Sequence, residues 1–402
     1  MLSQIRRLDA AIIILTLVNF VSSLGIAIML PLIPLYAISL GAAPVQLGLL
    51  TSAFALANAA AQLVAGLVVD RAGSRSLIRG GIATYAGANV LIATAATAPV
   101  LIAYRSLAGV GAGVNIISTR LYLAAVADPA HMAFVNGVIS AAYSAGQVVG
   151  PAFGGIISAL ANLRVPFLIV GATSALAFLG SLWLRRPEPR GAAAQAAQSS
   201  TPQDAGPASA FNRTAVVLFL AQLFLLAGYG GFITTYAPLA TESLGWTTFE
   251  VGLAFSVFGL GSIALGPWLS HLADRTGRRR IASLSMIPVS LFGAGMVWGW
   301  PRPALYLIMF AAGGGLTAFT GAWFALLREA APAARRGRTF GVVSAASNLG
   351  TVGGAMIASA LWAAVSLPAA MLSASVPVIL AGVTILLLTE QRTKAPAAPR
   401  RS

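Results

Sequence analysis

The sequence contains no cysteine, and this absence excludes disulfide bonds, thiolate catalysis and cysteine metal sites together. Charge is also scarce, because only 9% of the 402 residues are charged whereas 58% are hydrophobic. The mean hydropathy of +0.85 is far above that of a soluble domain, which needs more polar surface than this composition can supply. We therefore predict a polytopic membrane protein.

Histidine is nearly absent too, with only His131 and His271 in the chain. Both lie at the edges of apolar segments, and no cluster of nucleophiles, bases or metal ligands accompanies them. These residues disfavour a membrane-embedded enzyme, and we expect no catalytic residues, no metal and no cofactor.

Twelve apolar windows, each long enough to cross a hydrocarbon core of roughly 30 Å, follow one another along the chain. They lie at 10–37, 45–69, 77–97, 99–126, 133–160, 165–184, 213–240, 248–271, 281–300, 303–327, 339–365 and 369–389. The segment between the sixth and seventh windows is rich in Pro, Ala, Gln and Ser and cannot bury enough apolar area to fold. We predict an all-α protein with an N-terminal six-helix bundle (1–184), a flexible cytoplasmic linker (185–212), a C-terminal six-helix bundle (213–390) and a disordered cytoplasmic tail (391–402).

The two halves form an internal repeat at an offset of 204 residues. An even number of helices in each half gives both copies the same orientation, so we expect a pseudo-twofold axis along the membrane normal. Pro34, Ser39, Leu40, Gly41 and Gly48 recur as Pro238, Ser243, Leu244, Gly245 and Gly252, and Asp70, Arg71 and Gly73 recur as Asp274, Arg275 and Gly277.

Basic residues sort by membrane side. With a cytoplasmic N-terminus, 22 of the 25 lysines and arginines fall on the inside, and only Arg164 and Arg302 fall outside. The net charge of +15 is therefore a topology signal rather than a sign of a nucleic-acid partner. We expect both termini in the cytoplasm.

Glycines recur four residues apart in the fifth window, so on a helix they form a smooth strip that a neighbouring helix can approach closely. A proline beside the strip should bend this helix. The full pattern comprises Gly137, Gly146, Gly150, Pro151, Gly154 and Gly155. It resembles the antiporter motif in the fifth helix of exporters of the major facilitator superfamily.

The loop after the second window and its repeat each carry an aspartate followed by arginine. Such an aspartate can accept bonds from a neighbouring helix N-terminus, and the arginines can pair with carboxylates or lipid phosphates. The loops resemble the cytoplasmic signature loop of the same superfamily, which implies a latch holding the outward-facing state; a basic turn that only sets topology is the alternative. The latch residues are Gly66, Asp70, Arg71, Gly73, Arg75, Asp274, Arg275, Gly277 and Arg278, with Asp128 as the completing carboxylate. Ser74 and Ser270 depart from the family pattern.

Two further motifs lie inside helices of the first half. Gly25, Pro31 and Pro34 resemble a signature of the twelve-helix drug/proton antiporters, and the two prolines should loosen the outer part of the first helix. An arginine within the membrane is by default a functional candidate, although one near a helix end can also extend to the interface. Arg105, with Gly109 and Gly111, resembles the proton-transfer motif of these exporters.

A central cavity should be lined by the first, fourth, seventh and tenth helices, with contributions from the second, fifth, eighth and eleventh. All ten acids fall in loops or at helix ends, so either a terminal acid such as Asp9, Glu242 or Glu250 lies deeper than expected or coupling needs no buried carboxylate. The candidates are Asn19, Phe20, Asn115, Tyr143, Gln147, Gln222, Tyr229, Tyr236, Phe319, Trp323 and Asn348. This apolar, aromatic set favours amphipathic or neutral hydrophobic cargo.

Together the motifs resemble a drug/proton antiporter and imply the major facilitator fold, with two pseudo-symmetric bundles of six transmembrane helices. The expected function is multidrug-type export of small molecules in exchange for protons by a monomer in the bacterial inner membrane, with no nucleic-acid partner. A facilitator, an uptake symporter and a flippase for a lipid-linked substrate are the alternatives within the same fold.

Overall fold

The computed structural model describes residues 10–126, 132–185, 213–330 and 336–388. The predicted linker and tail, together with Asp9 and Asp128, lie outside the described residues, as do the side chain of Asp70 and the surroundings of Gly137.

The described chain is helical throughout, without strands, and each predicted window holds one helix or two consecutive ones. The first half contains α2 (Ala10–Met29), α3 (Ile33–Ser39), α4 (Pro44–Ala72), α5 (Ser74–Ala93), α6 (Ala98–Val126), α7 (Met132–Leu160) and α8 (Val165–Ser181). The second half contains α10 (Arg213–Pro238), the π-helix η1 (Leu239–Ser243), α11 (Thr248–Ala264), α12 (Gly266–Thr276), α13 (Arg278–Leu284), α14 (Met286–Val297), α15 (Arg302–Ala330), α16 (Arg336–Ala364) and α17 (Leu367–Leu386).

Seven spans in the described ranges are long and apolar enough to cross a membrane, and an eighth is reached when α11 and α12, bent by 46°, count as one. The apolar helix α8 is shorter, with 17 residues. The structure therefore confirms an all-α, multi-pass membrane protein, whereas a full set of twelve crossings stays a prediction.

Prolines shape the first helix of each half. α2 ends at Met29 and α3 begins at Ile33, so the chain breaks around Pro31 as the two prolines predicted, because proline has no amide hydrogen to donate. The repeat position Pro238 is where α10 gives way to η1. α7 behaves differently, because it continues as one helix through Pro151.

Glycines at equivalent positions of the two halves adopt the same unusual backbone conformation. Gly41 and Gly245 have φ angles of 77° and 62°, and Gly73 and Gly277 have φ angles of 75° and 116°. L-residues with side chains rarely adopt this region, so glycine is required at both turns. The two halves therefore make the same turns at positions 204 residues apart.

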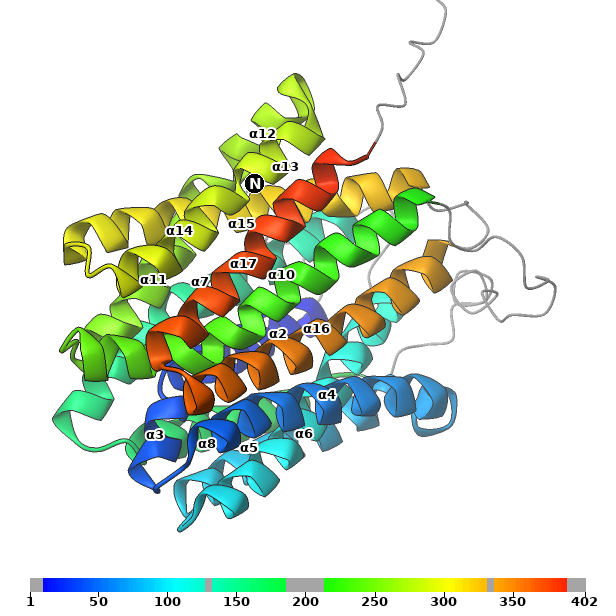
Figure 1. The fold of residues 1–402 in the computed structure, drawn as a ribbon. Helices are drawn as coiled ribbons and strands as arrows, with labels where there is room; N and C mark the ends of the chain where they lie inside the picture. The colour runs from blue at the N-terminus through cyan, green and yellow to red at the C-terminus, as the bar shows by residue number, and fades with distance from the viewer. Residues whose placement is uncertain (1–9, 127–131, 186–212, 331–335, 389–402) are drawn as a thin grey trace, which may run out of the picture.

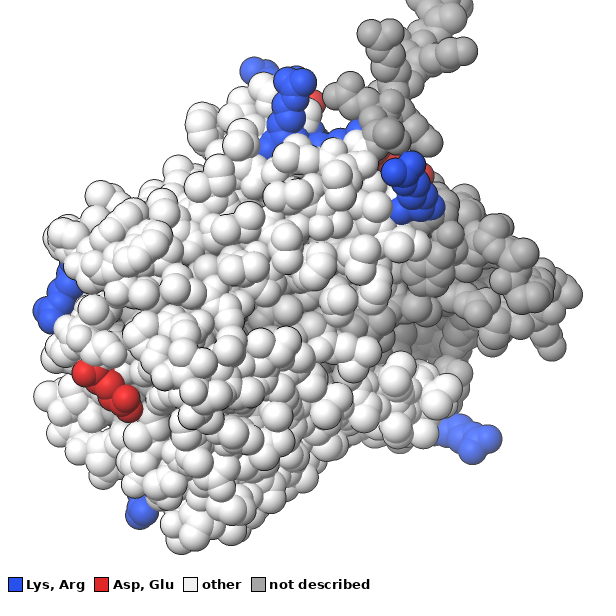
Figure 2. Space-filling model, viewed as in Figure 1, with Lys and Arg blue, Asp and Glu red and all other residues white. Residues whose placement is uncertain are grey.

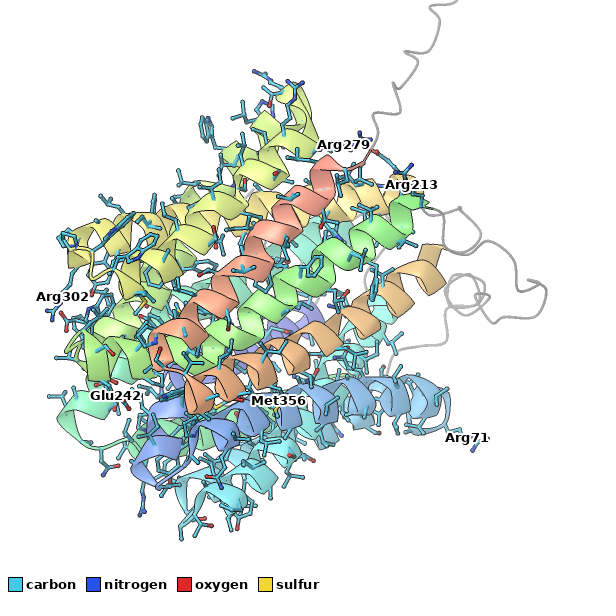
Figure 3. All side chains as sticks on the ribbon, in the orientation of Figure 1. Arg71, Arg213, Glu242, Arg279, Arg302 and Met356 are labelled. Atoms are coloured by element: carbon cyan, nitrogen blue, oxygen red, sulfur yellow. The ribbon has the colours of Figure 1, made fainter. Side chains whose placement is uncertain are left out.

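Figure 1 shows the first-half helices α3, α4, α5, α6 and α8 in the lower part of the view and α10 to α17 above them, with α16 running beside α4. Charged side chains gather at the two ends of the molecule, and a broad uncharged belt separates them (Figure 2). One end carries Arg71, Arg213 and Arg279, and the other carries Glu242 and Arg302 (Figure 3). We call the first the arginine-rich end and the second the opposite end.

Candidate functional site

The two halves meet at the opposite end through repeat-related glycines. A Cβ atom added to Gly48 of α4 would lie 2.8 Å from Ser359 Cβ of α16, and one added to Gly252 of α11 would lie 2.7 Å from the carbonyl carbon of Pro151 of α7. Carbon atoms normally approach to about 3.5 Å, so neither seam leaves room for a methyl group. Helices α4 and α16, and α7 and α11, therefore touch backbone to backbone.

Hydrogen bonds between the halves lie in the same region. Thr51 Oγ1 and Thr234 Oγ1 are 3.3 Å apart, and Thr248 Oγ1 donates to the carbonyl oxygen of Gly155 at 3.2 Å. Two more bonds join Ser52 Oγ to the Val352 oxygen and the Ala152 amide to Ser256 Oγ. The contacts described between the halves thus close the opposite end.

Two adjoining cavities lie between and within the halves. The smaller, of about 170 Å³, is lined by residues of α3, α4, α6, α10 and α16, and the larger, of about 510 Å³, by residues of α7 and the second half. Leu30, Leu226 and Tyr229 line both, so the two cavities share a wall. The larger volume is in the range of pockets that hold drug-sized molecules.

The larger cavity is mainly aromatic and apolar. Phe232, Phe255, Phe258 and Phe292 line it with Met309 and Met371. The polar groups at its wall include Gln147, Gln222 and Ser262. We call the part lined by these four phenylalanines and two methionines the phenylalanine chamber.

Arg105 lines the smaller cavity and is 5% exposed. Its guanidinium carbon lies 4.1 Å from the centre of the Phe54 ring, and its Nη1 donates to Met29 Sδ at 3.5 Å. The Nε atom has no hydrogen-bond partner among the described residues, and no described carboxylate pairs with this guanidinium. The backbone of Arg105 lies about 10 Å along the helix axis from the start of α6. Its side chain is buried against α2 and α4 and does not extend to the membrane interface.

Glycines fix the helix that carries Arg105. A Cβ atom on Gly109 would lie 2.6 Å from the Phe54 oxygen of α4, and one on Gly111 would lie 2.5 Å from the Tyr85 amide nitrogen of α5. Gly113 faces α4 as well, against Asn58. α6 is therefore wedged between two neighbours, which places the arginine beside the smaller cavity.

The glycine strip of α7 packs against α2, as expected of such a strip. A Cβ atom on Gly146 would lie 2.7 Å from the Leu24 amide nitrogen, and Gly150 and Gly154 continue the approach along the same helix. Gly155 turns to the other side, where its Cβ atom would lie 2.5 Å from the Thr248 oxygen of α11. α7 therefore links its own half to the second half. Gly25 of α2 faces α8, where an added Cβ atom would lie 3.2 Å from Thr173 Oγ1.

Five of the eleven predicted cavity residues line the cavities: Tyr143, Gln147, Gln222, Tyr229 and Asn348. The other six are not among the lining residues, and three of them, Tyr236, Phe319 and Trp323, are buried between helices. Asn19 donates to the Leu15 oxygen, Phe20 faces Gly146 through its carbonyl, Asn115 accepts from Thr119, Tyr236 donates to the Val251 oxygen, Trp323 donates to the Leu218 oxygen and Phe319 is fully buried.

The phenylalanine chamber was not predicted from the sequence. Phe292 of α14 and Met371 of α17 belong to helices that were not expected at the cavity. Small residues mark the place where α10, α14 and α17 come together: Gly293 faces Ser375 and Gly228 faces Val378. Apolar residues are common throughout this sequence, so they do not mark the cavity. The only sequence feature that could have predicted the chamber is the presence of glycines on α10 and α14 where these helices meet α17.

At the arginine-rich end, an ion-pair network forms in the second half. Arg278 Nε lies 2.7 Å from Asp274 Oδ1, and its Nη1 lies 2.5 Å from Glu329 Oε1 of α15. Glu329 was not predicted, although it occupies the helix-end position expected of a completing carboxylate. Ser74 stands at the repeat position of Arg278 and has no guanidinium to make the same pairs.

The other predicted latch residues lie on the surface of this end. Arg75 Nη2 donates to the Leu182 oxygen after α8, and Arg279 Nη1, its repeat position, donates to the Leu388 oxygen after α17. Both arginines thus satisfy carbonyl groups beyond a helix C-terminus. Arg71 and Arg275 are exposed, Gly66 faces open space, and Gly73 and Gly277 form the turns.

None of the described acids lines either cavity. Glu250 caps α11 through Thr247 and pairs with Arg302, with Arg302 Nη1 at 2.6 Å from Glu250 Oε1. Glu242 is exposed at the opposite end (Figure 3). Neither Glu250 nor Glu242 is therefore a protonatable group deeper in the membrane.

Comparisons with known proteins agree on one family. A family model described as Major Facilitator Superfamily matches residues 15–242 and 218–402. The quinolone resistance protein NorA of Staphylococcus aureus is 26% identical over 243 residues, and this chain spans 61% of its length. A multi-drug resistance efflux pump PmrA homolog of Lactococcus lactis is 28% identical over 374 residues, which cover 90% of each chain.

Solved structures show the same fold. A bacterial homolog of the human lysosomal transporter Spinster, inward-facing and unoccupied, has a TM-score of 0.72 at 17% identity and covers 94% of each chain. The nucleoside transporter NupG has a TM-score of 0.78 at 12% identity, over 94% of this chain and 99% of that one.

Proposed function

The chain belongs to the major facilitator superfamily, and from this premise we propose that it exports small amphipathic or hydrophobic molecules by alternating access, in exchange for protons. The relatives named for quinolone resistance and multidrug efflux support this direction of transport. The mainly apolar lining of the larger cavity supports cargo of this kind.

One observation carries the proposal: cavities lie between two halves whose described hydrogen bonds to each other lie toward the opposite end, with α7 and α11 in contact from that end as far as Gly259. Taking the arginine-rich end as cytoplasmic, by the positive-inside rule, this is the state that receives cargo from the cytoplasm. Both termini are then cytoplasmic and the membrane is the bacterial plasma membrane. The moving bodies are residues 1–184 and 213–390, joined by the segment 185–212.

Rocking of these bodies must break the seams at Gly48 and Gly252 and form contacts at the arginine-rich end. The ion pairs of Arg278 with Asp274 and Glu329 lie within the second half, so they hold its loop in shape while the first half approaches. We assign the latch to this loop and its first-half repeat. Their exposed arginines are free to change partners as the end closes.

Proton exchange supplies enough energy for useful export. A membrane potential of 100 mV contributes about 2.3 kcal/mol per charge, and one pH unit contributes about 1.36 kcal/mol. One proton per neutral molecule therefore sustains roughly a 500-fold concentration gradient. Arg105 is the residue that we place in the coupling, because it is the charged group at the cavity wall. Its guanidinium stays protonated, so it acts through its positive charge on the group that carries the proton and does not carry the proton itself.

Proton release on cargo binding tests this function. A pH-sensitive dye in lightly buffered solution reports release when lipophilic compounds are added to the purified protein. We expect release from the native protein and from Arg120→Ala, which removes an exposed arginine of the same helix that lines neither cavity, and loss of release in Arg105→Ala. Binding without proton release at any pH from about 5 to 9, a range that includes the ordinary histidine pKa, would contradict the exchange.

A facilitator is the second candidate, because none of the described acids lines a cavity. Such a protein would equilibrate its cargo across the membrane without a driving ion. Dissipating the proton gradient distinguishes the two, since only the exchanger then loses its ability to concentrate cargo.

A further inference from the structure

The two cavities differ in charge as well as in size. Arg105 is the only ionisable residue with a formal charge at neutral pH among the residues that line either of them. It belongs to the smaller cavity, whereas the phenylalanine chamber belongs to the larger. A molecule that fills both therefore meets a cation at one end and aromatic rings at the other.

The guanidinium is poised for an acceptor. Phe54 covers it at 4.1 Å and Met29 Sδ takes one weak bond, but Nε is buried without a hydrogen-bond partner in the described chain. A buried, unpaired donor on a charged group is costly, and an incoming oxyanion that accepts from this guanidinium would offset that cost. Thr51, Asn58 and Asn348 are polar residues of the same cavity wall, and Thr51 and Asn58 are hydrogen-bonded within the protein.

The phenylalanine chamber fits an apolar body. Phe255 and Phe292 both pack against Phe232, the first tilted with ring centroids 5.8 Å apart and the second edge to face at 6.1 Å. Such rings hold a planar or hydrocarbon group without hydrogen bonds, and methionines adapt their shape to it. Tyr229, at the wall shared by both cavities, places its ring between the two environments.

We propose that the preferred cargo is an amphipathic anion whose carboxylate or phosphate head binds Arg105 in the smaller cavity while its aromatic or alkyl body fills the phenylalanine chamber. This inference rests on the proposed export function and names its cargo class. A lipophilic cation of the same shape is disfavoured, because it would bring a second positive charge into a cavity that has no described carboxylate.

A matched series of probes tests the preference. The probes share a biphenyl body and a short alkyl arm that ends in a carboxylate, a phosphate monoester, an alcohol or a trimethylammonium group. Their binding to the full-length protein in lipid nanodiscs is measured by calorimetry, with empty nanodiscs to subtract partition into lipid. We expect the carboxylate or the phosphate, or both, to bind at least about thirtyfold tighter than the trimethylammonium probe.

Variants test separately the site for the charged head and the site for the apolar body of the cargo. Arg105→Gln should weaken the anionic probes at least about thirtyfold and change alcohol binding less than about threefold, whereas Arg105→Lys should keep part of the anion preference. Phe258→Ala should weaken all probes at least about fivefold, unlike Phe153→Ala, which changes a phenylalanine outside both cavities. Retained alcohol binding in Arg105→Gln shows that the variant is folded.

Three outcomes would overturn the proposal: equal binding of anion and cation, equal loss of alcohol and anion binding in Arg105→Gln, or no binding of any probe. Which anion binds more tightly distinguishes a carboxylate cargo from a phosphate one. The binding assay uses no gradient, so its result is independent of export. An exporter of neutral molecules would show no preference for the anionic probes and would still transport its cargo. A facilitator that binds anions would prefer the anionic probes but would not concentrate its cargo.

Discussion

The seam at Gly252 predicts that a single methyl group will open the end that is closed in this structure. An alanine Cβ there would lie 2.7 Å from the Pro151 carbonyl carbon and overlap its oxygen. A carbon contact needs about 3.5 Å, so α7 and α11 must separate by about 1 Å. Overpacking of this size costs about 1–3 kcal/mol, and only in the state in which this seam is closed.

Gly252→Ala should therefore raise the population open at the opposite end about 5- to 150-fold relative to the closed one. The absence of native cysteine makes the assay simple, because one cysteine introduced at Asn58, on the smaller cavity, is the only site for a maleimide. Labelling by a membrane-impermeant maleimide from outside the cell reports opening at that end. Gly48→Ala, at the repeat position, should act in the same direction.

Gly87→Ala is the matched control, because the added methyl group would meet no atom within 4 Å. We expect it to label at the native rate. If Gly252→Ala labels no faster than Gly87→Ala, the seam is not a contact that opens during transport, and the assignment of the moving bodies is refuted.

The remaining predictions concern the contact between Thr51 and Thr234, the ion pair of Arg278 with Glu329, and the buried side chain of Trp323. A disulfide between cysteines introduced at Thr51 and Thr234, whose hydroxyl oxygens are 3.3 Å apart, should abolish transport until a reductant is added, as measured in vesicles. Glu329→Gln removes one exposed pairing of Arg278, so we expect unfolding stability to fall by less than about 1 kcal/mol while the transport rate falls; an unchanged rate would contradict a role in the latch. Trp323→Phe removes a buried bond to a backbone carbonyl and should lower the melting temperature by an amount equivalent to about 1 kcal/mol without changing probe affinity, which calorimetry checks.

Several parts of this architecture follow directly from the sequence. Apolar windows long enough to cross a bilayer all became helices, because a backbone in lipid must satisfy its own hydrogen bonds. The repeat was visible because it depends on glycines at turns, as at Gly41 and Gly245, where few other residues fit. The break between α2 and α3 was predictable for a similar local reason, namely Pro31 and Pro34.

The cavity was harder to predict, because a membrane protein gives no contrast between an apolar residue that faces lipid, one that packs and one that lines a pocket. Tyr236 and Phe232 lie one helical turn apart and stack at 4.9 Å, yet only Phe232 lines the larger cavity. Polar residues were only partly better guides: Gln147 and Gln222 reach the cavity, whereas Asn19 bonds its own helix. Whether a residue lines the cavity or packs between helices depends on the direction of its side chain. That direction depends on how each helix is rotated about its axis relative to its neighbours.

The ion-pair network shows a third kind of limit. Arg278 was predicted from the repeated loop, but its partner Glu329 comes from the end of α15, 51 residues away. The repeat could not point to Glu329, because its first-half counterpart is Ala125. At Ser74 and here the two halves depart from symmetry, so the repeat does not predict these ion pairs.

Transport against an imposed proton gradient tests the central claim most directly. The purified protein is reconstituted in proteoliposomes, and accumulation of a labelled amphipathic probe is followed after an acid-inside gradient is imposed, with and without a protonophore. Proton-coupled export predicts accumulation above the external concentration that collapses on adding the protonophore and is lost in Arg105→Ala. Equilibration to the external concentration, unaffected by the gradient or the protonophore, would contradict it and indicate a facilitator.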